Sequence, residues 1–181
     1  MKLIHLTLLL FSFSFCLMPG QLQAEDGNTE YKVKAGYLFN FTKFIAWPKD
    51  DSETFNICII GQDPFGPLLD PIEKRTAFDL PIKLFRFNGI NKAQRCHIVF
   101  LGAGNKEEFT EKGALLVRDL GKSLSVGDGE AFAEGGGMIG FVNREGRIKL
   151  QINMKALQQS GLTVSAKLLE VAEIVGGNGH D

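Results

Sequence analysis

Few residues in this 181-residue chain have side chains suited to catalysis, and His97 is the one that a catalytic site would need most. The chain has three histidines, and the other two, His5 and His180, lie near its ends. A metal site built from several histidines is therefore excluded. A Ser-His-acid triad would require an exposed His97. The apolar run Cys96–Leu101 is typical of a buried strand and favours a core histidine instead.

Three short motifs resemble ligand-binding signatures only weakly. Gly102–Gly104 lacks the third glycine of a dinucleotide fingerprint. Asp128–Glu130 lacks the ligand spacing of a Ca²⁺ loop and fits a turn before a helical stub at Ala131–Ala133. Gly135–Gly137 supplies backbone freedom, with an anion cradle as the weaker alternative. The sequence therefore favours a binding or regulatory protein over an enzyme, without a metal or cofactor.

Residues 1–24 have the order of a secretory signal peptide. Lys2 precedes an apolar run, Leu3–Met18, which Pro19 and Gly20 end, and Ala24 offers a small residue at the cleavage point. The apolar run is short for a membrane span, although an uncleaved anchor is the alternative. We expect cleavage after Ala24, a single domain over residues 25–175 and a flexible tail over residues 176–181.

Removal of the leader, and Cys16 with it, leaves Cys58 and Cys96. Each lies in an apolar run of β type, and adjacent strands would bring the two within bridging distance. An even cysteine count in an oxidising compartment favours a disulfide, and two buried free thiols are the alternative.

The charge of the chain argues against nucleic acid as a partner. The net charge is −1, or −2 once Lys2 is removed with the leader. The sequence contains no basic stripe or run that could follow a phosphate backbone.

The first helical pattern places its large apolar residues unequally. Val33, Tyr37, Leu38, Phe41, Phe44 and Ile45 fall within an arc of roughly 140°. Asn40 and Trp47 lie at one edge of this stripe, Phe39 points well outside it, and Pro48 ends the helix. Either both faces of the helix are covered, or Phe39, Asn40 and Trp47 contribute to a surface that binds another protein.

The remaining elements alternate between strands and helices. Strands are expected at 55–60, 81–87, 98–101 and 123–126, a β-hairpin at 138–152, and helices at 65–73, 105–120, 154–160 and 165–175. This order predicts an α/β fold with a mostly parallel central sheet, helices on both faces and a C-terminal antiparallel hairpin. Phe132 and Phe141, near and in the hairpin, complete the expected protein-binding set.

Several segments, in their order and spacing, resemble the YfiR-like family across nearly all of Tyr31–Val175. The segments are Lys34–Pro48, Ile57–Gly61, Asp63–Gly66, Cys96–Leu101, Ser125–Asp128, Phe132–Ala133, Gly136–Phe141, Gln151–Asn153, Gly161–Leu162 and Leu168–Leu169.

The resemblance implies a periplasmic regulator without catalysis. The best-known members of this family repress an inner-membrane diguanylate cyclase by binding its periplasmic sensor domain, and an outer-membrane, peptidoglycan-binding lipoprotein can sequester them. They form homodimers, and Cys58 and Cys96 match one family disulfide. A second disulfide of some members has no counterpart here. The alternatives are a periplasmic small-molecule-binding module for another receptor or kinase and, third, a hydrolase.

Overall fold

The computed structural model describes residues 22–89, 93, 95–102 and 120–176. Most of the expected signal peptide, most of the expected helix at 105–120 and residues 177–181 of the tail lie outside these ranges. The described helices are α1 (Leu22–Phe44), α2 (Asp70–Glu73) with the preceding 3-10 turn η1 (Gly66–Leu69), α4 (Glu130–Glu134), α5 (Met154–Ser160) and α6 (Ala166–Leu169).

The described strands form an eight-stranded sheet and a separate two-stranded pair. The strands are β1 (Ile45–Ala46), β2 (Phe55–Ile60), β3 (Thr76–Ala77), β4 (Leu80–Phe87), β5 (Ile98–Leu101), β6 (Leu124–Asp128), β7 (Ile139–Arg144), β8 (Arg147–Asn153), β9 (Thr163–Val164) and β10 (Ala172–Val175).

The large sheet has the order β10-β8-β7-β6-β5-β2-β4-β3. Its centre, from β4 to β7, is parallel, and β7 and β8 form the antiparallel hairpin. The predicted fold class is therefore confirmed. Apart from Asn56, the residues of β2 and β5 are apolar and mostly buried on both faces of the sheet, as is typical of the centre of a parallel sheet.

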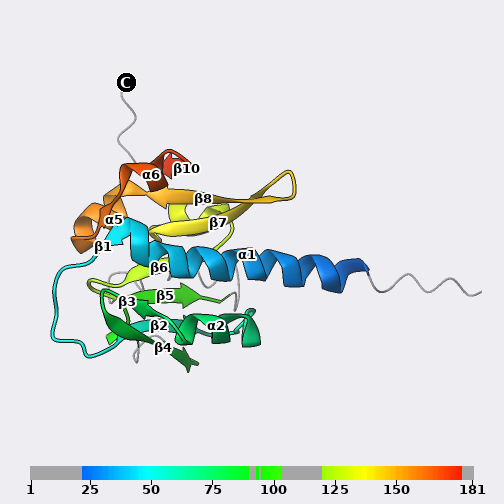
Figure 1. The fold of residues 1–181 in the computed structure, drawn as a ribbon. Coiled ribbons are helices and arrows are strands. Elements are labelled where there is room, and N and C mark those ends of the chain that lie inside the picture. Colours follow the sequence, from blue (N-terminus) through cyan, green and yellow to red (C-terminus); the bar gives the residue numbers. More distant parts are fainter. Residues whose placement is uncertain (1–21, 90–92, 94, 103–119, 177–181) are drawn as a thin grey trace, which may run out of the picture.

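Helix α1 lies across one face of the sheet (Figure 1). It buries Ala35, Leu38 and Phe41 against alternate residues of the central strands. Val33, which the apolar stripe placed in the core, is 45% exposed, so that part of the prediction is wrong. The helix also ends before Ile45, because Ile45 and Ala46 pair with β9 as a strand.

The opposite face of the sheet is covered in part by α4. Phe132 of α4 packs between Gly127 and Gly137, where a Cβ atom would lie 2.2 Å from the ring at either position. These two glycines are required by this close approach of the ring to the backbone. The described helices thus lie on both faces of the sheet.

The predicted last helix is only partly correct. Ser165 caps a helix, as expected, but α6 ends at Leu169 and residues 172–175 form β10, parallel to β8. β8 offers an unpaired edge, and Ile174 and Val175 have high β propensity, so strand pairing outweighs the helical spacing of Leu168, Leu169, Ala172 and Val175.

Candidate functional site

Trp47 is held at the end of the molecule where α1 finishes. Its indole Nε1–H donates a hydrogen bond to the carbonyl oxygen of His97 over 3.1 Å. Its ring meets the rings of Phe55 and Phe78 edge-on, with centroid distances of 5.2 and 5.9 Å. Trp47 follows β1 and does not lie on the helix, so its predicted place at a helix edge is wrong. It is half-buried and contributes both to the core and to the surface.

Phe78 was missed by sequence reasoning. It is 54% exposed at the tip of the β3–β4 hairpin, where Phe78 and Asp79 have φ values of 53° and 64°. A two-residue turn of this kind favours Asn-Gly, and a bulky residue with positive φ is strained. No sequence signal reveals the position, because Phe-Asp is not a typical pair for such a turn.

Phe39 lies beside two cationic side chains. The Arg75 guanidinium carbon is 4.5 Å and the Lys43 Nζ is 4.8 Å from the centre of its ring. Phe39 and its neighbour Asn40 are both half-buried, and Phe39 packs against the main core.

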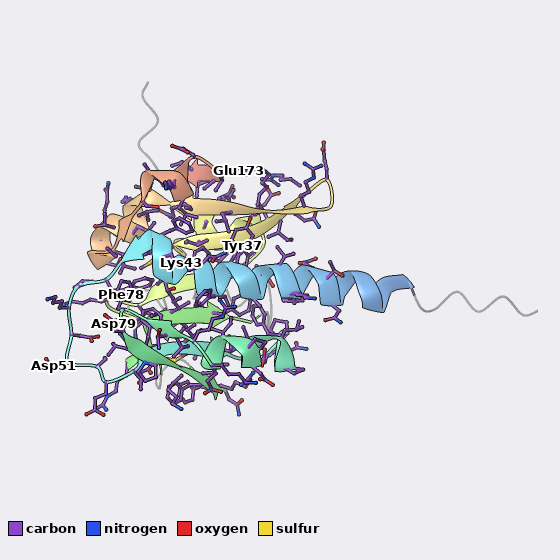
Figure 2. All side chains as sticks on the ribbon, in the orientation of Figure 1. Tyr37, Lys43, Asp51, Phe78, Asp79 and Glu173 are labelled. Carbon is purple, nitrogen blue, oxygen red and sulfur yellow. A yellow bond between two sulfur atoms is a disulfide. The ribbon has the colours of Figure 1, made fainter. Side chains whose placement is uncertain are left out.

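We call Phe39, Trp47 and Phe78 the aromatic surface. Figure 2 shows Lys43, Phe78 and Asp79 near the C-terminal end of α1. The Trp47 ring contacts the Phe78 ring, and the Lys43 ammonium contacts the Phe39 ring. These contacts place the three aromatic side chains at this end of the molecule. Aromatic rings beside cations form a surface able to bind an apolar partner with acidic groups.

Phe132 and Phe141 do not belong to this surface, which corrects their predicted role. Each is only 2% exposed. Phe141 points to the α1 face of the sheet and stacks on Phe41. Phe132 is buried because its ring packs between Gly127 and Gly137, on the face of the sheet opposite α1.

His97 is buried and has both ring nitrogens engaged. Nδ1 accepts a hydrogen bond from the Asn56 backbone N–H over 3.0 Å, and Nε2 lies 3.2 Å from Asp50 Oδ2. The imidazole also stacks on Phe55 at a centroid distance of 4.5 Å. Although Asp50 provides the acidic neighbour that a hydrolase would need, neither nitrogen is left to accept a proton from a nucleophile. The arrangement has a structural function.

The buried position of His97 makes stability dependent on pH. Burial lowers the pKa of His97 below its usual value near 6.5, and the Asp50 charge offsets only part of this effect. Below about pH 6.5 the unfolded chain therefore binds a proton at His97 that the folded protein does not bind, and stability is lost as the pH falls. We expect the free energy of unfolding to decrease by up to about 1.4 kcal/mol per pH unit in this range.

Urea unfolding of the wild-type protein and of His97→Gln between about pH 7 and pH 5 measures this contribution. The variant should be less stable at neutral pH, because it loses the ring stack, and its stability should fall less steeply with acidification. Parallel pH profiles for the two proteins would contradict the assignment.

Cys58 and Cys96 form a disulfide, as the sequence indicated, with a Cα–Cα distance of 5.9 Å. Cys58 lies on β2, and Cys96 lies just before the neighbouring strand β5. Both are buried in a second apolar cluster, with Val99 and Leu120, on the face opposite α1. The disulfide therefore ties β2 to the segment that precedes β5, close to His97.

A buried ion cluster holds α1 to the carboxyl end of β6. Lys34 is 3% exposed, and its Nζ lies 2.8 Å from Asp128 Oδ1 and beside Glu30. The Tyr31 hydroxyl donates to Asp128 Oδ2 over 2.8 Å. Burial, followed by this hydrogen bond, raises the pKa of Tyr31 above its usual value.

The carboxyl ends of the central strands form the crevice in which open α/β proteins usually bind ligands. Here the residues after β2 and β5 are in close contact, since a Cβ atom on Gly102 would lie only 1.9 Å from the carbonyl oxygen of Gln62.

Among the described residues, no group of three or more His, Cys, Asp and Glu side chains is arranged to hold a metal ion. No described helix has the length and apolar character needed to cross a membrane.

The parallel sheet with helices on both faces places the protein among the open α/β proteins. The chain belongs to the YfiR/HmsC-like family, whose model matches residues 31–173. This is a periplasmic, regulatory family connected with diguanylate cyclase signalling. No curated protein shows significant sequence similarity to the chain.

Two solved structures share the fold. One is the ABC domain from Streptococcus pneumonia in complex with L-Trp, with 13% identity and a TM-score of 0.53, covering 78% of this chain and 60% of that one. The other is a conserved domain protein from Vibrio cholerae O1 biovar El Tor, also with 13% identity and a TM-score of 0.53, covering 80% and 59%. The chain thus spans less than two thirds of the length of both.

Proposed function

We propose that this protein is a periplasmic regulator that binds and represses a membrane signalling protein, the periplasmic sensor domain of a diguanylate cyclase. The observation that carries this proposal is the family match over residues 31–173. The exposed and strained Phe78 supports it, because strain of this kind persists where function requires a particular side chain.

Repression would work through differential affinity. A regulator that binds the inactive sensor more tightly shifts the sensor toward that state. A shift from 1:99 to 99:1 requires a preference of about 5.5 kcal/mol. The aromatic surface is the proposed contact, with Phe78 as its anchor and the Lys43 and Arg75 cations facing acidic groups of the sensor.

Two further interactions belong to the proposal. An outer-membrane, peptidoglycan-binding lipoprotein would release the cyclase by sequestering the regulator. The protein would also form a homodimer, in which isologous contacts use one patch twice. Because both ring nitrogens of His97 are engaged, we propose no catalytic activity.

Phe78→Ser is expected to abolish repression while leaving the fold intact, because the side chain is largely exposed and the substitution removes a bulky residue from a left-handed turn. In the native host, deletion of the gene should raise cyclic di-GMP. The wild-type gene should restore the low level, and the Phe78→Ser gene should not.

Phe85→Ser is the matched control, since Phe85 is a partly exposed phenylalanine on β4, outside the aromatic surface. It should restore the low level. Trp47→Ala and Phe39→Ser extend the test but also remove packing. Sedimentation of each variant separates loss of a homodimer from loss of the sensor contact. If deletion of the gene leaves cyclic di-GMP unchanged, the cyclase proposal fails. If Phe78→Ser still represses, the assigned surface is wrong.

A further inference from the structure

A cavity of about 350 Å³ opens beside His97, on the side of the disulfide. Its lining includes the apolar side chains of Trp47, Pro48 and Leu120, which are buried or half-buried. Three exposed charged residues, Asp50, Arg95 and Lys122, also line it. The volume lies in the range of small-molecule sites, and the lining combines apolar walls with a few polar groups.

The apolar wall is preformed. The hydrogen bond from Trp47 Nε1 to the His97 carbonyl and the edge contact with the Phe55 ring fix the indole in one orientation. A ligand would not have to order this side chain, which lowers the entropic cost of binding. The indole therefore offers a flat, rigid surface for an apolar or aromatic group.

The charges of the lining favour an anion. Arg95 and Lys122 contribute two positive charges, and in the described part of the chain neither forms an ion pair with a carboxylate. Asp50 is the one acid in the lining, and both of its carboxylate oxygens already face groups of the protein itself. Its Oδ1 accepts a hydrogen bond from the Ser52 backbone N–H over 3.0 Å, and its Oδ2 faces His97 Nε2. A guanidinium and an ammonium at one rim are suited to a carboxylate.

We propose that this cavity binds a small organic anion, namely a carboxylate carried on a flat apolar body the size of one aromatic ring. The ring lies against Trp47 and Pro48, and the carboxylate meets Arg95 and Lys122. The cavity shares Trp47 with the aromatic surface but does not include Phe78, and the proposal does not depend on the identity of the signalling partner.

Trp47 is the only tryptophan in the sequence, so its indole N–H gives a single, unambiguous NMR signal from the cavity. The purified protein is titrated with phenylacetate, and with 2-phenylethanol and phenethylamine as neutral and cationic analogues. We expect phenylacetate to shift the Trp47 indole signal and the amide signals of Gly121 and Ser123 to saturation, with a dissociation constant of about 1 mM or lower. The two analogues should bind at least tenfold more weakly.

The double variant Arg95→Gln/Lys122→Gln should weaken phenylacetate binding at least tenfold, because both rim charges are lost. The control Lys155→Gln, which changes an exposed cation on α5 outside the cavity, should bind like the wild type. Both sets of substitutions are at exposed positions, and the spectra themselves report whether the fold is retained. The proposal is overturned if the Trp47 signal does not respond to saturation, if the neutral or cationic analogue binds as tightly, or if the double variant keeps wild-type affinity. None of these results bears on repression of a cyclase, which is measured separately.

Discussion

Replacement of Lys34 by alanine is expected to lower the free energy of unfolding by about 3–4 kcal/mol. The ammonium group is buried between Glu30 and Asp128 and lies 4.3 Å from the centre of the Tyr31 ring. Without it, two carboxylates face each other in a partly desolvated position with one hydrogen bond, from Tyr31, to compensate. Urea denaturation measures the loss.

Two companion variants identify its cause. Lys32→Ala removes an exposed lysine from the same helix and should change stability by less than about 0.5 kcal/mol. Lys34→Met keeps most of the apolar stem and removes the charge, so it should recover only the packing part of the loss. A change below about 1 kcal/mol for Lys34→Ala would mean that water already solvates the cluster, and that the ion pair does not stabilise the fold.

The Cys58–Cys96 disulfide is expected to contribute a similar amount to the free energy of unfolding. Its two cysteines are 38 positions apart in the sequence, and a loop of this length corresponds to about 4 kcal/mol in the chain-entropy model. We expect Cys58→Ala/Cys96→Ala to lose about 4–5 kcal/mol, since two buried sulfur atoms are removed as well as the cross-link.

Reducing agent separates the cross-link from the packing. Wild-type protein unfolded in dithiothreitol should lose the contribution of the cross-link but stay more stable than the double variant by the packing of its two thiols, and the variant itself should not respond to dithiothreitol. Because Cys58 is fully buried, reduction should require unfolding and be slow under native conditions. Equal stability of the variant and the oxidised wild type would show that the unfolded chain is already constrained in this region.

The sequence predicted those parts of the fold whose signals are local. β2, β5 and α5 begin and end where the sequence predicted them, and the Asn153 side chain caps α5 by accepting a hydrogen bond from the Ala156 N–H. Residues 172–175 were predicted as helix because their spacing suits one. Their actual partner, β8, lies earlier in the chain, and periodicity within one segment cannot reveal it.

The candidate site was predicted less completely for the same reason. Phe39 and Trp47 were predicted to contribute to a binding surface because they did not fit the helical stripe, and both are partly exposed. Phe132 and Phe141 were assigned to the surface as aromatics near and in the hairpin, whereas Phe132 packs between Gly127 and Gly137 and Phe141 stacks on Phe41 of α1. Phe78 depends on a left-handed backbone conformation that its residue type disfavours, and the cavity beside His97 unites segments that are distant in the sequence.

The pairing of β1 with β9 and of β8 with β10 has a consequence for the order in which the molecule can form. Ile45 and Ala46 follow the first helix, yet their partners Thr163 and Val164 are among the last described residues. In a chain that emerges N-terminus first, neither pairing can therefore form until almost the whole chain has emerged. Until then α1 lacks the strand that anchors its end, and β8 presents an open edge to other chains. Native contacts of such long range form slowly, and the incomplete chain is the form most exposed to proteases, chaperones and aggregation.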